Sequence, residues 1–229
     1  MSSLQPLYAY ALCRSLQQPV QLPAGIAGAL AVIDNGTLSA LVEPDTFYEA
    51  IAADDTQLMA AVVIHDRVLC QVFESIALLP LRFGTRFASQ AALLAHLETY
   101  GDRYLQQLQA LEGKAEYLLK LMPAAIDLPE ITPGLKGRDY FLAKKQRLQT
   151  QTNAQQQQQE ELAQLWVEIN QLAAPVQSEP LREGAERIYL LLEPAQYSRL
   201  LPQINLWQQQ YLWWEISLSQ ALPPYHFLT

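Results

Sequence analysis

Short runs of apolar residues separated by turn residues dominate the first third of the chain, a pattern typical of β-strands. Runs at 8–12 and 30–33 predict two strands, and Asp34-Asn35-Gly36 before the run at 38–42 predicts a hairpin. Asn-Gly favours this turn because type I′ turns need positive φ angles. The three strands should share one sheet. The segment 17–28 contains two prolines and two glycines and should form an exposed loop.

Two amphipathic helices are predicted after these strands. Asp54 or Asp55 can cap the first, and Ser89 can cap the second. Their apolar residues recur at steps of three and four: Leu58, Val62, His65, Leu69, Val72 and Ile76 in the first, and Leu93, Leu97, Tyr100, Tyr104, Leu108 and Leu111 in the second. The apolar run 77–83 between them predicts an edge strand or an irregular strand end, because Pro80 cannot donate a ladder hydrogen bond.

A long helical pattern occupies much of the second half of the chain, from about 138 to 173. Apolar anchors stand at both ends, but 149–161 has almost none and includes five consecutive glutamines, so this stretch should face water or a partner. A second helix is predicted at 194–210, and Pro202 should kink it. Further strands are predicted at 116–122, 187–192 and 211–219.

These elements predict an α+β fold class with two domains and a tail. Residues 1–112 should form a mainly antiparallel sheet covered by helices. Residues 113–220 show the order β-α-β-α-β, one strand short of the split β-α-β-β-α-β pattern, and predict a modified ferredoxin-like domain. Residues 221–229 form a C-terminal tail.

Composition narrows the functional classes. The chain has 229 residues, of which 50% are hydrophobic, and a formal net charge of -8. An acidic chain is not strongly attracted to nucleic-acid phosphates or anionic lipids, so no nucleic-acid partner is expected. No run of about 18 apolar residues offers a membrane span. The N-terminus lacks the features of a secretory signal, so an intracellular location is expected.

Residues that could support catalysis or metal binding are few and poorly spaced. His65, His96 and His226 show no metal-ligand spacing, and phosphate-binding and serine-hydrolase motifs are absent from the sequence. No catalytic residue, cofactor or metal is therefore expected, and the chain does not resemble an enzyme. Cys70 and His65 could form a thiol site, but their spacing of five residues on a helix does not bring them together. A core histidine and a buried thiol are the favoured interpretations.

Two clusters of side chains could bind a ligand or could be structural. The positive patch consists of Lys136, Arg138, Lys144, Lys145 and Arg147. A solvated helix face is favoured for it over a nucleic-acid site. The aromatic cluster consists of Trp207, Tyr211, Trp213 and Trp214. At this spacing, core filling is favoured over a ligand site.

Segments from both ends and from the middle of the chain together resemble the gas vesicle protein F/L family. Tyr8-Ala9-Tyr10-Ala11 is similar to its first strand. His65-Asp66-Arg67-Val68-Leu69, followed by Leu79-Pro80-Leu81-Arg82-Phe83-Gly84-Thr85, resembles its central stretch. Pro223-Pro224-Tyr225-His226-Phe227 resembles its closing PPYSF signature, although many members end in GPWPPYSF and this chain does not. The order and separation of the segments make the combination fairly specific.

The resemblance implies a non-enzymatic intracellular protein that helps to build gas vesicles, the hollow protein-walled flotation organelles of prokaryotes. Its expected location is the gas vesicle. Its expected partners are the major gas vesicle shell protein, which is small and hydrophobic, and other accessory gas vesicle proteins. The resemblance leaves the oligomeric state open.

Two short segments are candidates for partner binding. Arg82, Phe83 and Arg86 could present a surface to the shell subunit; alternatively, Arg82 is an internal arginine paired with a carboxylate of the preceding helix. The candidates in the tail are Pro223, Pro224, Tyr225 and Phe227. The tail could capture a partner, or it could pack back on the sheet with its aromatic side chains as plugs.

The leading hypothesis is a structural or assembly protein that binds aggregation-prone shell subunits. Such a task requires apolar edges and grooves rather than catalytic groups, and β-augmentation is one plausible mode. The alternative is a scaffold that self-associates, or recruits accessory vesicle proteins, through the Gln-rich helix.

Overall fold

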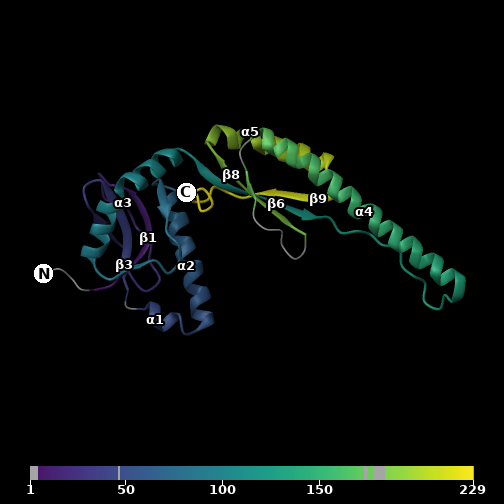
Figure 1. Cartoon of the computed structure of the whole chain (residues 1–229), viewed down its shortest axis with the longest axis horizontal. Coiled ribbons are helices and arrows are strands. Elements are labelled where there is room, and N and C mark those ends of the chain that lie inside the picture. Colours follow the sequence, from purple (N-terminus) through teal and green to yellow (C-terminus); the bar gives the residue numbers. More distant parts are fainter. Residues whose placement is uncertain (1–4, 46, 173–174, 178–183, 229) are drawn as a thin grey trace. The chain divides into compact units, whose positions relative to one another are not determined.

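The computed structural model describes residues 5–45, 47–172, 175–177 and 184–228, and it combines helices with two sheets (Figure 1). The chain divides into two compact units. We call residues 1–116 together with 221–229 the N-terminal unit, and residues 117–220 the C-terminal unit. The tail therefore belongs to the N-terminal unit. An α+β fold with antiparallel strand pairing agrees with the class predicted from the sequence.

The sheet of the N-terminal unit has β1 at its centre. Its strands are β1 (Leu7–Arg14), β2 (Ala31–Asp34), β3 (Leu38–Pro44), β4 (Leu78–Pro80) and β5 (Arg86–Phe87). The order is β2-β3-β1-β4, and β5 pairs with β1 beside β4. The predicted hairpin is confirmed as β2 and β3, and Pro80 lies on an edge strand as expected. Six consecutive residues of β1 are buried, so both faces of this strand are covered.

Helices α2 and α3 pack on this sheet, and a short helix, α1 (Tyr48–Ile51), precedes them (Figure 1). The Asp54 side chain accepts backbone hydrogen bonds at the start of α2 (Asp55–Phe73), and Ser89 does so at the start of α3 (Gln90–Leu111). Both predicted caps are confirmed. The buried side chains of α2 are Ala61, His65, Val68, Leu69 and Val72. Val62 and Tyr100 are exposed, so the predicted stripes were wrong at these two positions.

The C-terminal unit contains one strand that the sequence pattern did not reveal. Its strands are β6 (Ala115–Pro123), β7 (Val176–Gln177), β8 (Glu186–Leu192) and β9 (Trp214–Leu218), and its helices are α4 (Gly137–Leu172) and α5 (Pro194–Gln210). The spatial order of the strands is β7-β8-β6-β9. The missed strand, β7, has two residues, too few for a recognisable alternation. β9 is shorter than predicted because Tyr211 ends α5.

The aromatic cluster fills the core of the C-terminal unit. Trp207, Tyr211 and Trp214 are buried, as the core interpretation expected. The Trp207 indole and the Tyr211 hydroxyl both donate hydrogen bonds to the carboxylate of Glu168 on α4. Burial, followed by the bond to Glu168, raises the pKa of Tyr211 to about 12, so this phenol stays protonated and donates. Glu168 thus fastens α5 to α4.

Removing this shared acceptor should destabilise the C-terminal unit. We expect Glu168→Ala to lower the free energy of unfolding by about 2–4 kcal/mol, because two largely buried donors lose their partner. All four tryptophans lie within residues 117–220, so tryptophan fluorescence during urea unfolding reports on this unit. Gln159→Ala, an exposed position on the same helix, is the control and should change stability by less than about 0.5 kcal/mol. Equal unfolding midpoints for the two variants would contradict the role of Glu168.

Candidate functional site

A buried hydrogen-bond network joins β1, α2 and the turn after β4. The Tyr8 hydroxyl lies 2.9 Å from His65 Nδ1 and accepts a hydrogen bond from the Gly84 backbone N–H at 3.2 Å. His65 Nε2 lies 3.1 Å from the Leu81 carbonyl oxygen. Because a carbonyl can only accept, Nε2 carries the proton and Nδ1 accepts from Tyr8. A neutral imidazole satisfies every group in this network.

The surroundings of His65 favour this neutral form. Tyr10 stacks on the imidazole with ring centroids 5.0 Å apart, and Phe83 meets it edge-on at 5.6 Å. Burial in this aromatic niche lowers the pKa of His65, because the charged form loses its hydration. Burial likewise raises the pKa of Tyr8. His65 is therefore a satisfied core residue, as expected, and Phe83 is one of the rings around it.

A second buried network holds the loop between β1 and β2. Glu43, only 1% exposed, accepts a hydrogen bond of 2.7 Å from the Tyr10 hydroxyl. The backbone N–H groups of Ile26 and Ala27 donate to the same carboxylate. A Cβ atom on Gly25 would lie 2.2 Å from Glu43 Oε2, so this close approach requires glycine. The loop expected to be exposed is thus fastened at its centre by a buried acid.

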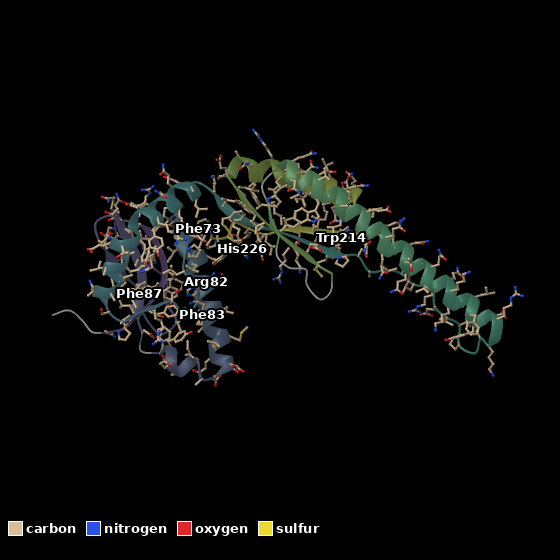
Figure 2. All side chains as sticks on the ribbon, in the orientation of Figure 1. Phe73, Arg82, Phe83, Phe87, Trp214 and His226 are labelled. Atoms are coloured by element: carbon tan, nitrogen blue, oxygen red, sulfur yellow. The ribbon has the colours of Figure 1, made fainter. Side chains whose placement is uncertain are left out.

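The two candidate arginines have different environments. Arg86 donates to Asp45 and to Glu49, and its guanidinium lies 4.7 Å from the centroid of the Tyr48 ring. Arg82 is exposed, and among the described residues it forms no ion pair. The alternative of an internal, carboxylate-paired Arg82 was therefore wrong. The chain turns after β4, which exposes Arg82 while the neighbouring Phe83 stays in the aromatic niche (Figure 2).

The tail packs on its own chain within the N-terminal unit. Leu222 and Glu116 exchange backbone hydrogen bonds of 2.8 and 3.0 Å. The Glu116 carboxylate, fully buried, also accepts from the backbone N–H of His226 and lies 2.8 Å from its Nδ1. The Tyr225 hydroxyl donates to Asp66 on α2 at 2.6 Å.

This packing agrees with the alternative in which the tail packs back on its own chain. Pro223 and Pro224 are buried, Tyr225 and Phe227 are half-buried, and Tyr225 packs against the core beside α2. The tail thus contacts α2 through Tyr225 and pairs with the start of β6 through Leu222. The two prolines are internal and the two aromatic side chains are partly accessible, and whether these four residues contact a partner stays a prediction.

The segments that resemble the gas vesicle family are hydrogen-bonded to one another. Tyr8 is hydrogen-bonded to His65, His65 is hydrogen-bonded to the Leu81 carbonyl, and Tyr225 of the tail is hydrogen-bonded to Asp66. Sequence reasoning missed the acids that organise their surroundings, Glu43 and Glu116. Each is an acidic residue at one end of an apolar run, Glu43 after 38–42 and Glu116 before 117–119, and that position was the available signal.

The structure gives no geometric support for the alternative thiol site. His65 uses its two nitrogens for Tyr8 and Leu81, whereas the Cys70 sulfur lies 4.0 Å from the Tyr225 hydroxyl. Across the described ranges, no three histidine, cysteine, aspartate or glutamate residues gather in a way that could hold a metal ion. Within the same ranges, no helix is both long and apolar enough to cross a membrane.

Comparison with known proteins identifies the family. Residues 6–229 match the family described as gas vesicle synthesis protein GvpL/GvpF. The chain belongs to this family. The resemblance noted in the sequence is thereby confirmed. Gas vesicle protein F from Streptomyces sp. (strain CB03234) is 32% identical over 117 residues, which cover 49% of this chain. The match spans about half of that relative, 47% of its length.

Two crystal structures of gas vesicle protein GvpF share the fold of this GvpL/GvpF family member. The protein from Anabaena sp. PCC7120 has a TM-score of 0.73 at 17% identity, covering 98% of this chain and 96% of that one. The protein from Microcystis aeruginosa has a TM-score of 0.70 at 16% identity, covering 98% and 99%. At these identities the likeness shows the fold alone.

The lowered pKa of His65 predicts a loss of stability in mild acid. Its pKa in the folded chain lies below the unfolded value of about 6.5, so the unfolded chain takes up the proton first as the pH falls. Stability from this residue is therefore complete above about pH 6.5 and declines below it, by at most about 1.4 kcal/mol per pH unit. His65→Gln keeps a donor and an acceptor but does not titrate.

The test compares urea unfolding of the two proteins by circular dichroism at about pH 7.5 and about pH 5.5, on either side of the unfolded histidine pKa. The wild type should lose more stability on acidification than His65→Gln. The carboxylates and the other two histidines are common to both proteins and cancel in the difference. An equal acid loss in both would show that His65 is not the group responsible.

The Glu116 contacts predict how the tail is held. Glu116→Ala removes the acceptor for the His226 backbone N–H and its ring, so the tail should open more often. Hydrogen–deuterium exchange of peptides covering 220–228 should become at least about tenfold faster, the change expected for about 1.4 kcal/mol. Glu112→Ala, at an exposed position nearby, should leave exchange of these peptides unchanged. Unaltered exchange in Glu116→Ala would contradict this anchoring role.

Proposed function

We propose that this protein assists gas vesicle formation by binding the major shell protein through an exposed apolar stripe on α2. Met59, Val63, Asp66 and Cys70 follow one another at steps of four, three and four residues, so they lie on one face of the helix. The Tyr225 hydroxyl contacts Asp66 and Cys70. Met59 and Val63 remain 64% and 65% exposed, and this half-covered stripe is the observation that carries the proposal.

The chemistry of the stripe suits an apolar partner. Val62 lies beside Met59 and Val63 on the helix and is also exposed, so three apolar side chains adjoin one another. Burying a methionine or valine side chain completely contributes about 2 kcal/mol each. Clustered exposed apolar side chains with a polar rim are typical of protein-binding surfaces. A hydrophobic shell subunit would supply the matching surface.

Family membership supports the biological setting of the proposal. The matching family is described as a gas vesicle synthesis protein, and the relatives are gas vesicle proteins F. We place the protein at the gas vesicle, with other accessory vesicle proteins as further partners and with no enzymatic role. Arg82, exposed on the same unit, is retained as a candidate contact. Phe83 and the tail prolines are proposed to shape the surface from within, and Arg86, exposed and paired with Asp45 and Glu49, is also retained as a candidate contact.

We also interpret the C-terminal unit as a modified ferredoxin-like domain. Its element order, β6-α4-β7-β8-α5-β9, is the split β-α-β-β-α-β pattern once the short β7 is counted. The spatial order β7-β8-β6-β9 is consistent with that interpretation. This domain would carry the long α4 helix.

The decisive experiment is a pull-down of the full-length chain with the major shell protein. The wild type should retain the shell protein, and Met59→Ser combined with Val63→Ser should weaken retention at least about tenfold, because the apolar area available for burial is lost. Gln57→Ser combined with Gln71→Ser alters exposed positions on another face of α2 and is the matched control.

The outcomes distinguish the proposed function, binding of the shell protein, from the binding surface assigned to α2. If the wild type does not bind the shell protein, the proposed function is wrong. If the wild type and the α2 double variant bind equally, the function stands and the assigned surface is wrong. Circular dichroism of each variant checks the fold, which should be unaffected because these side chains are exposed.

A further inference from the structure

Helix α4 carries an exposed stripe that runs along almost its whole length. Its buried residues, Ala154, Leu165 and Ile169, lie between the middle of the helix and its C-terminal end, where it packs on its own unit. A different set of residues forms the outer stripe, at steps of three, four and seven: Leu142, Gln149, Asn153, Gln156, Glu160 and Val167. All of them are exposed. Leu142 and Val167, 53% and 59% exposed, are the apolar members and lie at the two ends.

Charge is segregated along the same helix. Residues 138–147 hold four basic side chains and one acidic one, a net charge of +3. Residues 148–172 hold three acidic side chains and no basic one, a net charge of -3. This distribution opposes the helix dipole, which favours acidic groups near the N-terminus and basic groups near the C-terminus. Within a single copy of the helix, the interaction of these charges with the helix dipole is therefore unfavourable.

A second copy of the helix, packed antiparallel to the first, would offset this unfavourable electrostatic interaction. Antiparallel packing brings the basic half of each helix beside the acidic half of the other, and the two dipoles run in opposite directions. Parallel packing would place like charges together. The glutamine and asparagine side chains between the ends both donate and accept hydrogen bonds, so this surface can pair with an identical one.

We propose that two copies of this chain associate through antiparallel packing of their α4 outer stripes. A twofold axis between Asn153 and Gln156 brings Leu142 of each copy against Val167 of the other. Leu142 lies eleven residues before Asn153, and Val167 lies eleven residues after Gln156, so the two are equally far from the axis. Lys145 of each copy then lies beside the turn that carries Glu160 of the other. The two apolar contacts and the two charge contacts are related by the same axis, as a closed dimer requires.

A charge-swap experiment on the full chain tests the pairing. Sedimentation velocity over a concentration series should show a dimer for the wild type. Lys145→Glu and Glu160→Lys should each weaken dimerisation about fivefold to tenfold, because two symmetric contacts become like-charge pairs. The double variant should recover wild-type affinity to within about twofold, since the charges are exchanged and each pair is restored. Arg199→Glu, an exposed change on α5, should have no effect.

Cysteine cross-linking tests the direction of the helices. Leu142→Cys and Val167→Cys are made as separate proteins and oxidised alone and as a mixture, and the linked peptides are mapped by mass spectrometry. The mixture should form a 142–167 cross-link, and neither variant alone should form a dimer through its new cysteine. A monomeric wild type, a double charge variant without recovery, or a 142–142 cross-link would each overturn the proposal.

Discussion

The buried hydroxyl of Tyr8 is the constraint on which the N-terminal unit depends. β1 is covered on both faces, so this hydroxyl has no access to water and must find partners within the protein. Its partners are the imidazole of His65 on α2 and the backbone N–H of Gly84 in the turn after β4. One polar atom in the core therefore determines where a helix and a turn lie against the central strand.

The same requirement explains why His65 is neutral. Its two nitrogens bridge Tyr8 and the Leu81 carbonyl, an arrangement that needs one donor and one acceptor. Protonation would turn the acceptor into a donor facing a hydroxyl that already receives the Gly84 N–H. The lowered pKa of His65 follows from burial, which outweighs the opposite effects of the Leu81 carbonyl and of Asp66. A histidine that resembles a catalytic group in the sequence is here a structural link.

Helix α2 connects this core with the outside of the unit. One face carries His65, and another binds the tail through Asp66. The first turns of that second face remain apolar and exposed at Met59 and Val63. In the C-terminal unit, α4 combines the same two features: its second half is fastened to the core through Glu168, while its outer stripe stays in water. Glutamine suits such a stripe because it has a fair helix propensity and carries no charge.

The sequence alone determined the central strands of the first sheet, the caps at Asp54 and Ser89, the long α4 helix and the family, whereas the middle of α4, expected to face water or a partner, also contacts its own unit at Ala154 and Gln158. These features depend on residues within a few positions of one another, which a local pattern records. Only the tertiary structure placed the tail on α2, exposed Arg82, and buried Glu43 and Glu116 with their partners. Those contacts join residues far apart in the chain, 57 positions for Tyr8 and His65 and 159 for Tyr225 and Asp66. Local periodicity does not specify which distant group satisfies a buried polar atom.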